Sequence, residues 1–443
     1  MDSTTISSPY LSSLHPKATF NLAKRTLLTR LSYDNKTDTL LHLGDIVTKG
    51  SLHGSLDVLS FLSSNGIQGV RGNQDQKVIE WRGWITWIVS RPGGTEFLQA
   101  AQHSWEKAKE KGDTLKSWNK QQRRCAEKAS SSLSDEEELM DKNTAKWWHV
   151  VPSDWTLFSD PYMIASEMTE MHYEYLISLP VRIHVPHAHL FLVHAGLLSH
   201  NPKYDYDDPS QPLSHLPTIS RIYAYGDKIN ALRDALNPLT GWMARLVVQN
   251  KDSHRGDVAE DIVREQQERA ILDLPVNKDP WVSMNLRSVK DGKPSRCVCM
   301  LLSSYIGILT HVNNVRSNKG TPWSEIWNAD MDMCHGFDTR DAVDPSTGVM
   351  KKRRELPCLP MSVIYGHAAA RRLDIKRWSF GIDTGCVSSV MYLPLTCWIT
   401  EIAQAKKHQL TALVHGGTHD DGGELVAFGD ASQARIVSVK CKS

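Results

Sequence analysis

The segment Gly44-Asp45-Ile46-Val47-Thr48-Lys49-Gly50 decides the fold, because it places an aspartate in a glycine-bounded turn directly after an apolar run at residues 39–43. A short apolar run of this kind reads as a buried strand. Residues 56–63 have a helical pattern and return to a second apolar run at 66–70. Because strand and helix alternate in this way in parallel α/β units, the segment predicts an α/β fold with polar side chains at strand ends.

Three later motifs repeat this arrangement of metal-binding residue types in glycine-bounded turns. They are Arg71-Gly72-Asn73-Gln74-Asp75, Val193-His194-Ala195-Gly196-Leu197 and Tyr365-Gly366-His367. The last two follow apolar runs at 190–193 and 361–364. A carboxylate, a carboxamide and two imidazoles on such loops are the oxygen and nitrogen ligands that a di-metal centre uses. We therefore predict that the ligands Asp45, Asn73, His194 and His367 converge on one metal site.

The order of the four motifs resembles that of the calcineurin-like metallophosphoesterases, in the branch related to serine/threonine phosphoprotein phosphatases. That family reads Gly-Asp-x-His-Gly, Gly-Asp-x-x-x-Arg/Lys-Gly, Gly-Asn-His-Glu/Asp, His-Gly/Ala-Gly-Leu and Gly-His. Several phrases look closer still to fungal zinc-dependent endopolyphosphatases, and the resemblance covers more than half of the chain. These phrases are Val70-Arg71-Gly72-Asn73, Ala270-Ile271-Leu272-Asp273, Asn285-Leu286-Arg287-Ser288 and Gly381-Ile382-Asp383-Thr384-Gly385-Cys386.

The resemblance implies an α-β-β-α sandwich, in which two mixed sheets are flanked by helices. It also implies a metal-dependent phosphohydrolase that cleaves phosphoanhydride bonds of inorganic polyphosphate. Zinc is the metal that the family suggests, and manganese or iron would fit the same ligands. Alternatives on the same fold are a phosphoprotein or a diadenosine-polyphosphate phosphatase. An alternative of another class is a pseudoenzyme that binds metal or polyphosphate without turnover.

By the same resemblance, Asp45 is the carboxylate that bridges two ions, and Asn73, His194 and His367 complete the second metal site. Lys49 stands where phosphoprotein phosphatases hold a phosphate-binding arginine. A lysine there is a point charge instead of a bidentate fork, which suits a flexible polyanion. Arg287 is expected to be a second phosphate-binding residue.

The chain departs from the family pattern before Asp45, because no Gly-Asp-x-His-Gly motif precedes it. That motif supplies the aspartate and histidine of the first metal. A missed exon or a true loss would explain the difference, and a true loss predicts at most one transition metal per chain. If two ions bind, His15 or His53 would have to replace the motif.

A second departure lies at Gln74, where relatives carry a histidine that protonates the leaving oxygen and is oriented by the following acid, here Asp75. Glutamine cannot act as a general acid, and such catalysis contributes about 10²–10⁴-fold. A phosphoanhydride leaving group is already acidic and needs less protonation than a serine alkoxide. Gln74 therefore favours anhydride substrates over phosphoserine.

Composition excludes several classes of function. The net charge is +1, from 51 basic and 50 acidic side chains, so no overall field attracts nucleic acid or an anionic membrane. Any recognition of anions must therefore be local. The eight cysteines contain no Cys-x-x-Cys pair, which predicts reduced thiols and no disulfide scaffold. The N-terminus lacks the pattern of a signal peptide, and no apolar run reaches the ~20 residues of a membrane span.

We expect residues 1–20 to be a disordered lead and 21–440 a single metallophosphoesterase domain. Polar helical insertions are predicted near 100–150 and 226–272. Two patternless segments, 297–317 and 388–405, read as translated introns or lineage insertions. Related fungal endopolyphosphatases are vacuolar with an N-terminal anchor, so we expect a vacuolar location, or a cytoplasmic one if the chain is complete as written. The oligomeric state is left open.

Aromatic and histidine clusters have simpler interpretations. Trp81, Trp84 and Trp87 recur at helical spacing within a predicted helix at 76–89 and are interpreted as core. His184, His187 and His189 lie at spacings that place them on different faces of a strand and its lead, so they are interpreted as solvated or core-edge histidines.

Overall fold

The computed structural model describes most of the chain. The described residues are 19–34, 36, 38–48, 50–131, 142–206, 208–216, 255–290, 293–296, 320–337, 355–385, 409–415 and 422–441. Residues 1–18 of the predicted lead, 226–254 of a predicted insertion and the patternless segments at 297–317 and 388–405 lie outside them, as do Lys49 and the acidic residues at 135–138. A helix begins at Thr19, inside the expected lead of residues 1–20.

A mixed five-stranded sheet forms the centre of the α/β fold. Its order is β3 (Arg182–Val185), β4 (Leu190–Val193), β8 (Ser362–Tyr365), β10 (Ser379–Gly381) and β9 (Asp374–Ile375). The three inner strands are parallel, and the two edge strands run antiparallel to them. The fully buried apolar pattern of β4 is typical of a strand covered on both faces.

Two smaller sheets lie against one face of this sheet. The larger is antiparallel, with β13 (Ser432–Lys440) between β11 (Gln409–His415) and β12 (Glu424–Phe428). The smaller is the parallel pair β1 (Leu41–His42) and β2 (Gln68–Gly69). A buried cluster joins the central sheet to the antiparallel sheet: it contains Leu190, Leu192 and Phe380 of the first and Phe428 and Ala434 of the second. The structure is therefore a sandwich, although only the central sheet is mixed.

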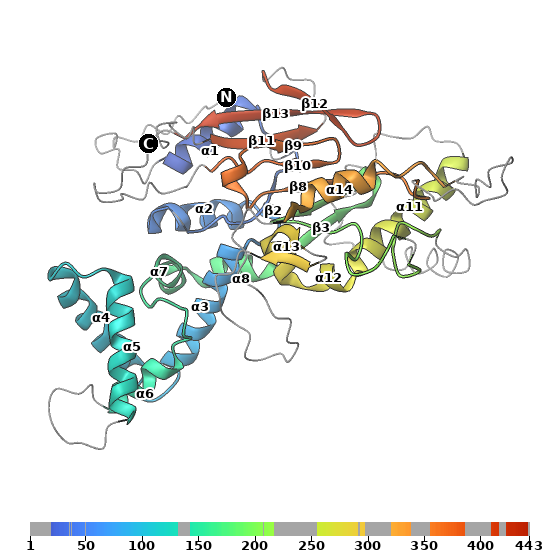
Figure 1. Cartoon of the computed structure of the whole chain (residues 1–443). Helices are drawn as coiled ribbons and strands as arrows, with labels where there is room; N and C mark the ends of the chain where they lie inside the picture. Colours follow the sequence, from blue (N-terminus) through green and yellow to red (C-terminus); the bar gives the residue numbers. More distant parts are fainter. Residues whose placement is uncertain are drawn as a thin grey trace, which may run out of the picture.

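Helices cover the two outer faces of the sandwich (Figure 1). On one side, Phe191 and Val193 of β4 pack with Trp327 of α14 (Trp323–Met331) and Ile271 of α11 (Arg255–Asp273). On the other, Leu27 of α1 (Thr19–Arg30) packs on Val437 and Val439 of β13. Alternate residues of a strand face opposite sides, so β4 and β13 each serve two layers. This is the expected α-β-β-α order.

A third antiparallel sheet and short helices complete this part of the molecule. The sheet has the order β6 (Lys293–Arg296), β5 (Leu286–Lys290) and β7 (Thr321–Pro322). The helices α12 (Pro275–Lys278) and α13 (Pro280–Asn285) lead into β5, and η2 (Pro186–Ala188) and η3 (Ala369–Arg371) are short 3₁₀ turns. Within the described residues, no helix is long and apolar enough to cross a membrane.

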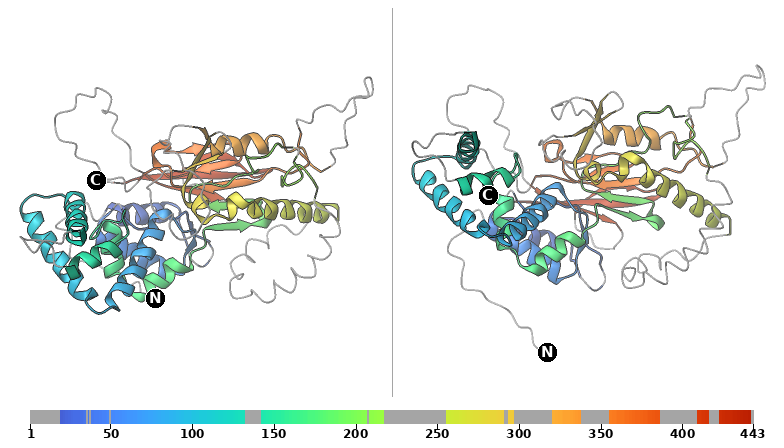
Figure 2. Two further views of the ribbon diagram at one scale, coloured as in Figure 1. Left: turned by 60° about the horizontal axis from the view of Figure 1, so that its bottom comes forward. Right: turned by 90° about the horizontal axis from the view of Figure 1, so that it is seen from below.

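A helical lobe lies at one end of the sandwich (Figures 1 and 2). Its helices are α2 (Leu52–Ser64), α3 (Asn73–Val89), α4 (Gly94–Glu110), α5 (Leu115–Ser131), α6 (Lys142–Val150), α7 (Asp160–Glu167) and α8 (Glu170–Ser178). Trp81 is buried against Trp155 and Tyr162, and Trp84 packs on its edge, as the core interpretation requires. Trp87 is 39% exposed, so the aromatic stripe leaves the core at its end.

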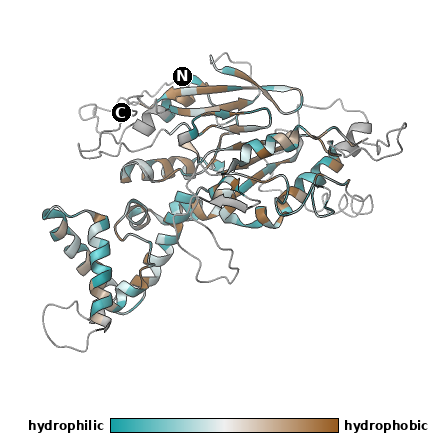
Figure 3. Cartoon of the chain, in the orientation of Figure 1, coloured by the Kyte–Doolittle hydropathy of each residue, from teal (hydrophilic) through white to brown (hydrophobic). Residues whose placement is uncertain are grey.

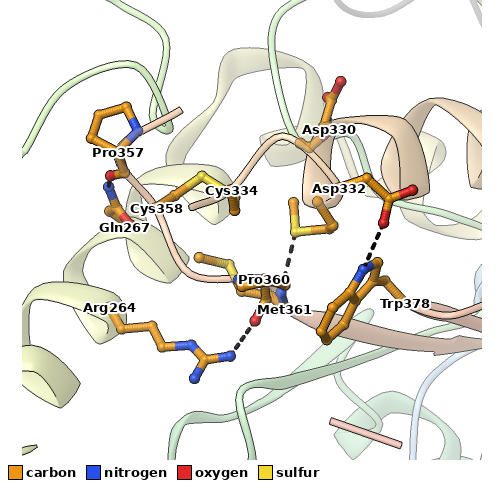
Figure 4. The surroundings of a disulfide bond; sticks show 12 residues. Arg264, Gln267, Asp330, Asp332, Cys334, Pro357, Cys358, Pro360, Met361 and Trp378 are labelled. Carbon is orange, nitrogen blue, oxygen red and sulfur yellow. Dashed lines mark hydrogen bonds between the residues drawn. A yellow bond between two sulfur atoms is a disulfide. The ribbon is translucent and has the colours of Figure 1, made fainter. Parts of the chain in front are cut away.

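One sequence prediction about the cysteines is wrong. Cys334 and Cys358 form a disulfide, with Cα atoms 4.7 Å apart, and Cys441 is also disulfide-bonded. Cys334 follows α14 and Cys358 precedes β8, and both side chains lie in the core beneath the sheet. Their spacing of 24 residues carries no motif, because tertiary packing brings them together. Figure 4 shows the bond beside Pro357, whose carbonyl accepts a hydrogen bond from Gln267.

Candidate metal centre

The four predicted ligands lie where neighbouring parallel strands end. Asp45 follows β1, Asn73 is the first residue of α3 after β2, His194 directly follows β4, and His367 follows β8. The strand β4 begins and ends at the predicted residues, and β8 is shifted by one residue from the predicted run. Because β4 and β8 are parallel neighbours, their last residues bring the two imidazoles to the same edge.

The four side chains form one compact group of ligand atoms. His194 Nε2 lies 3.3 Å from Asp45 Oδ1, 3.2 Å from Asn73 Oδ1 and 3.1 Å from His367 Nδ1. The Asn73 oxygen is 3.1 Å from His367 Nδ1. In the described part of the chain, Asp45, His194 and His367 are the one group of three metal-binding side chains with ligand atoms all within 4.8 Å of one another.

The hydrogen bond and neighbours of His194 make this group a fit for a cation. Its Nδ1–H donates to the carbonyl oxygen of Leu43 at 2.6 Å, so in the neutral imidazole Nε2 is the nitrogen that carries the lone pair. That lone pair faces oxygens of Asn73 and Asp45, and neither oxygen has a hydrogen to offer. The His194 side chain is only 1% exposed, so water does not relieve this contact between acceptors. A divalent metal would satisfy these atoms, and a carbonyl partner on the other ring nitrogen is typical of metal-bound histidine.

Backbone strain accompanies two of the ligands. Asp45 has a φ of 52° and His367 a φ of 64°, in the left-handed region that residues other than glycine seldom adopt. Such strain clusters at functional sites and costs about 1–3 kcal/mol per residue. The turns of Asp45 and Asn73 also touch, because a Cβ at Gly72 would overlap the backbone nitrogen and the carboxylate of Asp45. Glycine at this position is therefore required for the close approach.

Asp75 supports the turn that carries Asp45. Its buried carboxylate accepts hydrogen bonds from the backbone N–H groups of Gly72 at 2.8 Å, Asp45 at 2.9 Å and Ile46 at 3.0 Å. Burial, and after it the neighbouring Asp45 carboxylate, raise the pKa of Asp75 to about 6, against the lowering effect of the N–H donors. The sequence predicts an acid that orients residue 74, whereas these contacts hold the backbone around the ligand.

The remaining predicted site residues lie at different distances from the centre. The backbone N–H of Gln74 donates to Asp45 Oδ1 at 2.8 Å, at the start of α3. Arg287, on β5, donates to the carbonyl oxygen of His367 at 3.3 Å, so it lies beside this ligand. Lys49 is outside the described residues, and its predicted contact with phosphate stays a prediction.

His42 supports the turn that carries Asp45, and no sequence motif indicates this role. Its Nδ1 accepts a hydrogen bond from the N–H of Gly44, and its Nε2 is 2.8 Å from the hydroxyl of Tyr175. That hydroxyl donates to the carbonyl of Ile67, so the imidazole must donate from Nε2 and is neutral. Burial lowers the pKa of His42 to about 4, with His194 as a second cause. A neutral histidine beneath the Asp45 turn adds no positive charge that would repel a metal.

The histidines near β3 have a structural role. His184 Nε2 lies 2.5 Å from one oxygen of Glu268, and His189 Nδ1 lies 2.8 Å from the other. Glu268, on α11, is fully buried, and burial raises its pKa while lowering that of His184 to about 4. These contacts join α11 to the edge of the sheet and agree with the core-edge interpretation of His184 and His189.

Comparison with known proteins gives little further information. No protein-family model and no curated protein matches the chain. A solved structure described as a candidate diadenosine tetraphosphatase is 14% identical, and the match covers 83% of this chain and 80% of that one with a TM-score of 0.32. At this TM-score nothing is inferred from the likeness, so the function must be inferred from the site itself.

Proposed function

We propose that this protein is a metal-dependent phosphohydrolase that cleaves phosphoanhydride bonds of inorganic polyphosphate. The observation that carries the proposal is the contact of His194 Nε2 with the oxygens of Asp45 and Asn73 and the ring of His367. These ligands come from four segments far apart in the chain. Together they hold an oxygen- and nitrogen-lined cation site at the edge of the sheet.

Each residue has a definable task in such a site. Asp45 supplies the one negative charge of the four ligands, Asn73 adds an oxygen without charge, and His194 and His367 fix the geometry as neutral imidazoles. When bound, a divalent ion of this kind polarises a phosphoryl oxygen and lowers the pKa of bound water toward ~7. Asp75 holds the Asp45 turn through its backbone contacts, so it is a positioning residue. Arg287, which donates to the His367 carbonyl, is the residue that would bind a phosphoryl oxygen in this proposal.

The choice of anhydride over monoester rests on Gln74 and Lys49. Gln74 starts α3 beside Asp45 and cannot protonate a leaving oxygen. A phosphate leaving group is stable as an anion and can depart without a proton donor, whereas a serine alkoxide needs one. Lys49 offers one point charge, which suits a flexible chain of phosphates. Diadenosine polyphosphates share the anhydride chemistry and are the second candidate substrate.

The disulfide bears on location. Disulfides persist in oxidising compartments and are rare in the cytosol, where thiols stay reduced. The Cys334–Cys358 bond therefore favours the vacuolar over the cytoplasmic location that the sequence left open.

Assays of the purified chain with Zn²⁺ or Mn²⁺ test the proposal. Long-chain polyphosphate, diadenosine tetraphosphate and a phosphoserine peptide serve as substrates, with His194→Asn as the control. We expect polyphosphate to be shortened faster than the peptide is dephosphorylated, and the variant to be inactive. Preference for the peptide would overturn the substrate assignment. Metal binding without turnover of any of the three would establish the pseudoenzyme instead.

A further inference from the structure

The outward face of α5 carries a row of cations at four-residue intervals. Lys116, Lys120, Arg124 and Lys128 are all exposed. Residues four apart are neighbours on a helix, separated by about 6 Å along its axis. The four side chains therefore form a continuous ribbon of positive charge, which we call the α5 cation row. Figure 3 shows that the lobe around α5 is largely hydrophilic.

The opposite face of α5 anchors the helix in the lobe. Trp118 and Ala126 are buried in the lobe core, and the buried Asn119 exchanges hydrogen bonds with the backbone of Leu157. Arg123 donates to the carbonyls of Val151, Pro152 and Trp155, at 2.8, 2.7 and 2.8 Å, and so is occupied by the fold. These contacts fix the rotation of the helix, so the row must point to solvent.

The row differs from the basic run at the end of α4 in having few acidic residues beside it in the sequence. Within the residues that the structure describes, no acidic side chain forms an ion pair with Lys116, Lys120 or Arg124. On α5 itself, Glu127 is the single acid. The lysines at the end of α4, by contrast, alternate with acids in the run Glu106-Lys107-Ala108-Lys109-Glu110-Lys111. Since the whole chain carries a net charge of only +1, the row is a local concentration of charge.

We propose that the α5 cation row is an exosite that binds a length of polyphosphate chain away from the cleavage site; this inference rests on the proposed function. A linear polyanion carries charge at every unit and matches a row of evenly spaced cations. Single-stranded nucleic acid is another linear polyanion, but its binding sites add aromatic side chains on which bases stack. The aromatic residue of α5, Trp118, is only 1% exposed, so the row offers no such platform.

The position of the lobe predicts a dependence on chain length. The helix α3 starts at the metal-site residue Asn73 and ends next to α4, and its 17 residues span about 25 Å. A short phosphate chain cannot reach both the metal site and the row, whereas a long chain can. Engaging both raises the effective concentration of scissile bonds at the site. The row should therefore lower KM for long polyphosphate chains and have no effect on KM for short ones.

The test compares Lys116→Gln/Lys120→Gln/Arg124→Gln with a matched control, Lys107→Gln/Lys109→Gln/Lys111→Gln. Both remove three exposed charges from the lobe. Binding of metal-free protein to long-chain polyphosphate is measured as a function of salt, and KM is measured for long-chain polyphosphate and for tripolyphosphate. For the α5 variant we expect the slope of log affinity against log salt to fall by about 2. We also expect KM for the long chain to rise by about tenfold with KM for tripolyphosphate unchanged.

Several results would overturn the exosite. They are unchanged binding in the α5 variant, an equal loss in the α4 control, an equal rise of KM for tripolyphosphate, or competition by single-stranded RNA as strong as by polyphosphate. The binding measurement needs no turnover. If the wild type binds through the row but cleaves no polyphosphate, the proposed function fails while the exosite stands.

Discussion

At the scale of single residues, the site depends on glycine as much as on its ligands. Gly44 and Gly72 pack backbone against backbone, which lets the turns that carry Asp45 and Asn73 meet. The convergence of the four side chains could be predicted because each stands in or beside a glycine-bounded turn after an apolar run. The supporting contacts could not be predicted. The hydrogen bonds of Asp75 with backbone N–H groups and of His194 with the carbonyl of Leu43 depend on tertiary geometry.

Two glycines near the site provide a matched pair of substitutions. Gly72→Ala should destabilise the protein by about 1–3 kcal/mol, because its Cβ would overlap Asp45 backbone and carboxylate atoms. Gly83 is an exposed position of helix α3 with no atom within 4 Å of a new Cβ, so Gly83→Ala should stabilise the protein by about 0.5–1 kcal/mol. Urea titration measures both. Equal effects of the two substitutions would contradict the close approach of the two turns.

Gln74 is the residue that most directly controls substrate choice in the proposed mechanism. Gln74→His would supply a proton donor at the start of α3, beside Asp45. We expect hydrolysis of a phosphomonoester to rise within the range of about 10²–10⁴-fold that general acids contribute, and hydrolysis of polyphosphate to change far less. Initial rates on both substrates at one pH give the comparison. Equal gains in rate on both substrates would show that Gln74 does not select substrates by their leaving group.

At the scale of elements, apolar pattern predicted the fully buried strand better than the partly buried ones. The run at 190–193 became β4 without change, because both its faces are covered. The runs at 39–43 and 66–70 became the two-residue strands β1 and β2, which pair with each other and, within the described residues, with no further strand. The disulfide could not be predicted, because it joins the end of α14 to the segment before β8 through packing rather than through a local motif.

The disulfide stabilises the approach to β8, the strand before His367. The Cys334→Ala/Cys358→Ala variant should lose about 3 kcal/mol of unfolding free energy, because a disulfide between residues 24 apart restricts the unfolded chain by about that amount. Cys125→Ala is the matched control, because Cys125 is a free thiol on α5. Urea titration under non-reducing conditions measures the loss. A double variant as stable as the control would show that packing around Gln267 and Pro357 already holds this segment.

At the scale of the whole molecule, a bound metal would join parts that the sheets hold separately. Asp45 and Asn73 follow the β1–β2 pair, whereas His194 and His367 follow strands of the central sheet. A cation among the four should therefore stabilise the sandwich as a unit. The sequence could predict this arrangement because parallel strands end at a common edge. It could not predict how the lobe and α5 are placed, since no motif relates them to the site.

Removal of metal tests this coupling. Chelation should lower the melting temperature, and added Zn²⁺ or Mn²⁺ should restore it, because an ion at a hundredfold excess over its Kd stabilises the folded state by about 2.7 kcal/mol. His194→Asn should abolish the response, since it removes the atom that contacts the other three ligands. Elemental analysis should find at most one transition metal in the wild type and none in the variant. Two tightly held ions would show that further residues complete a second site, and a variant that keeps its metal would exclude His194 as a ligand.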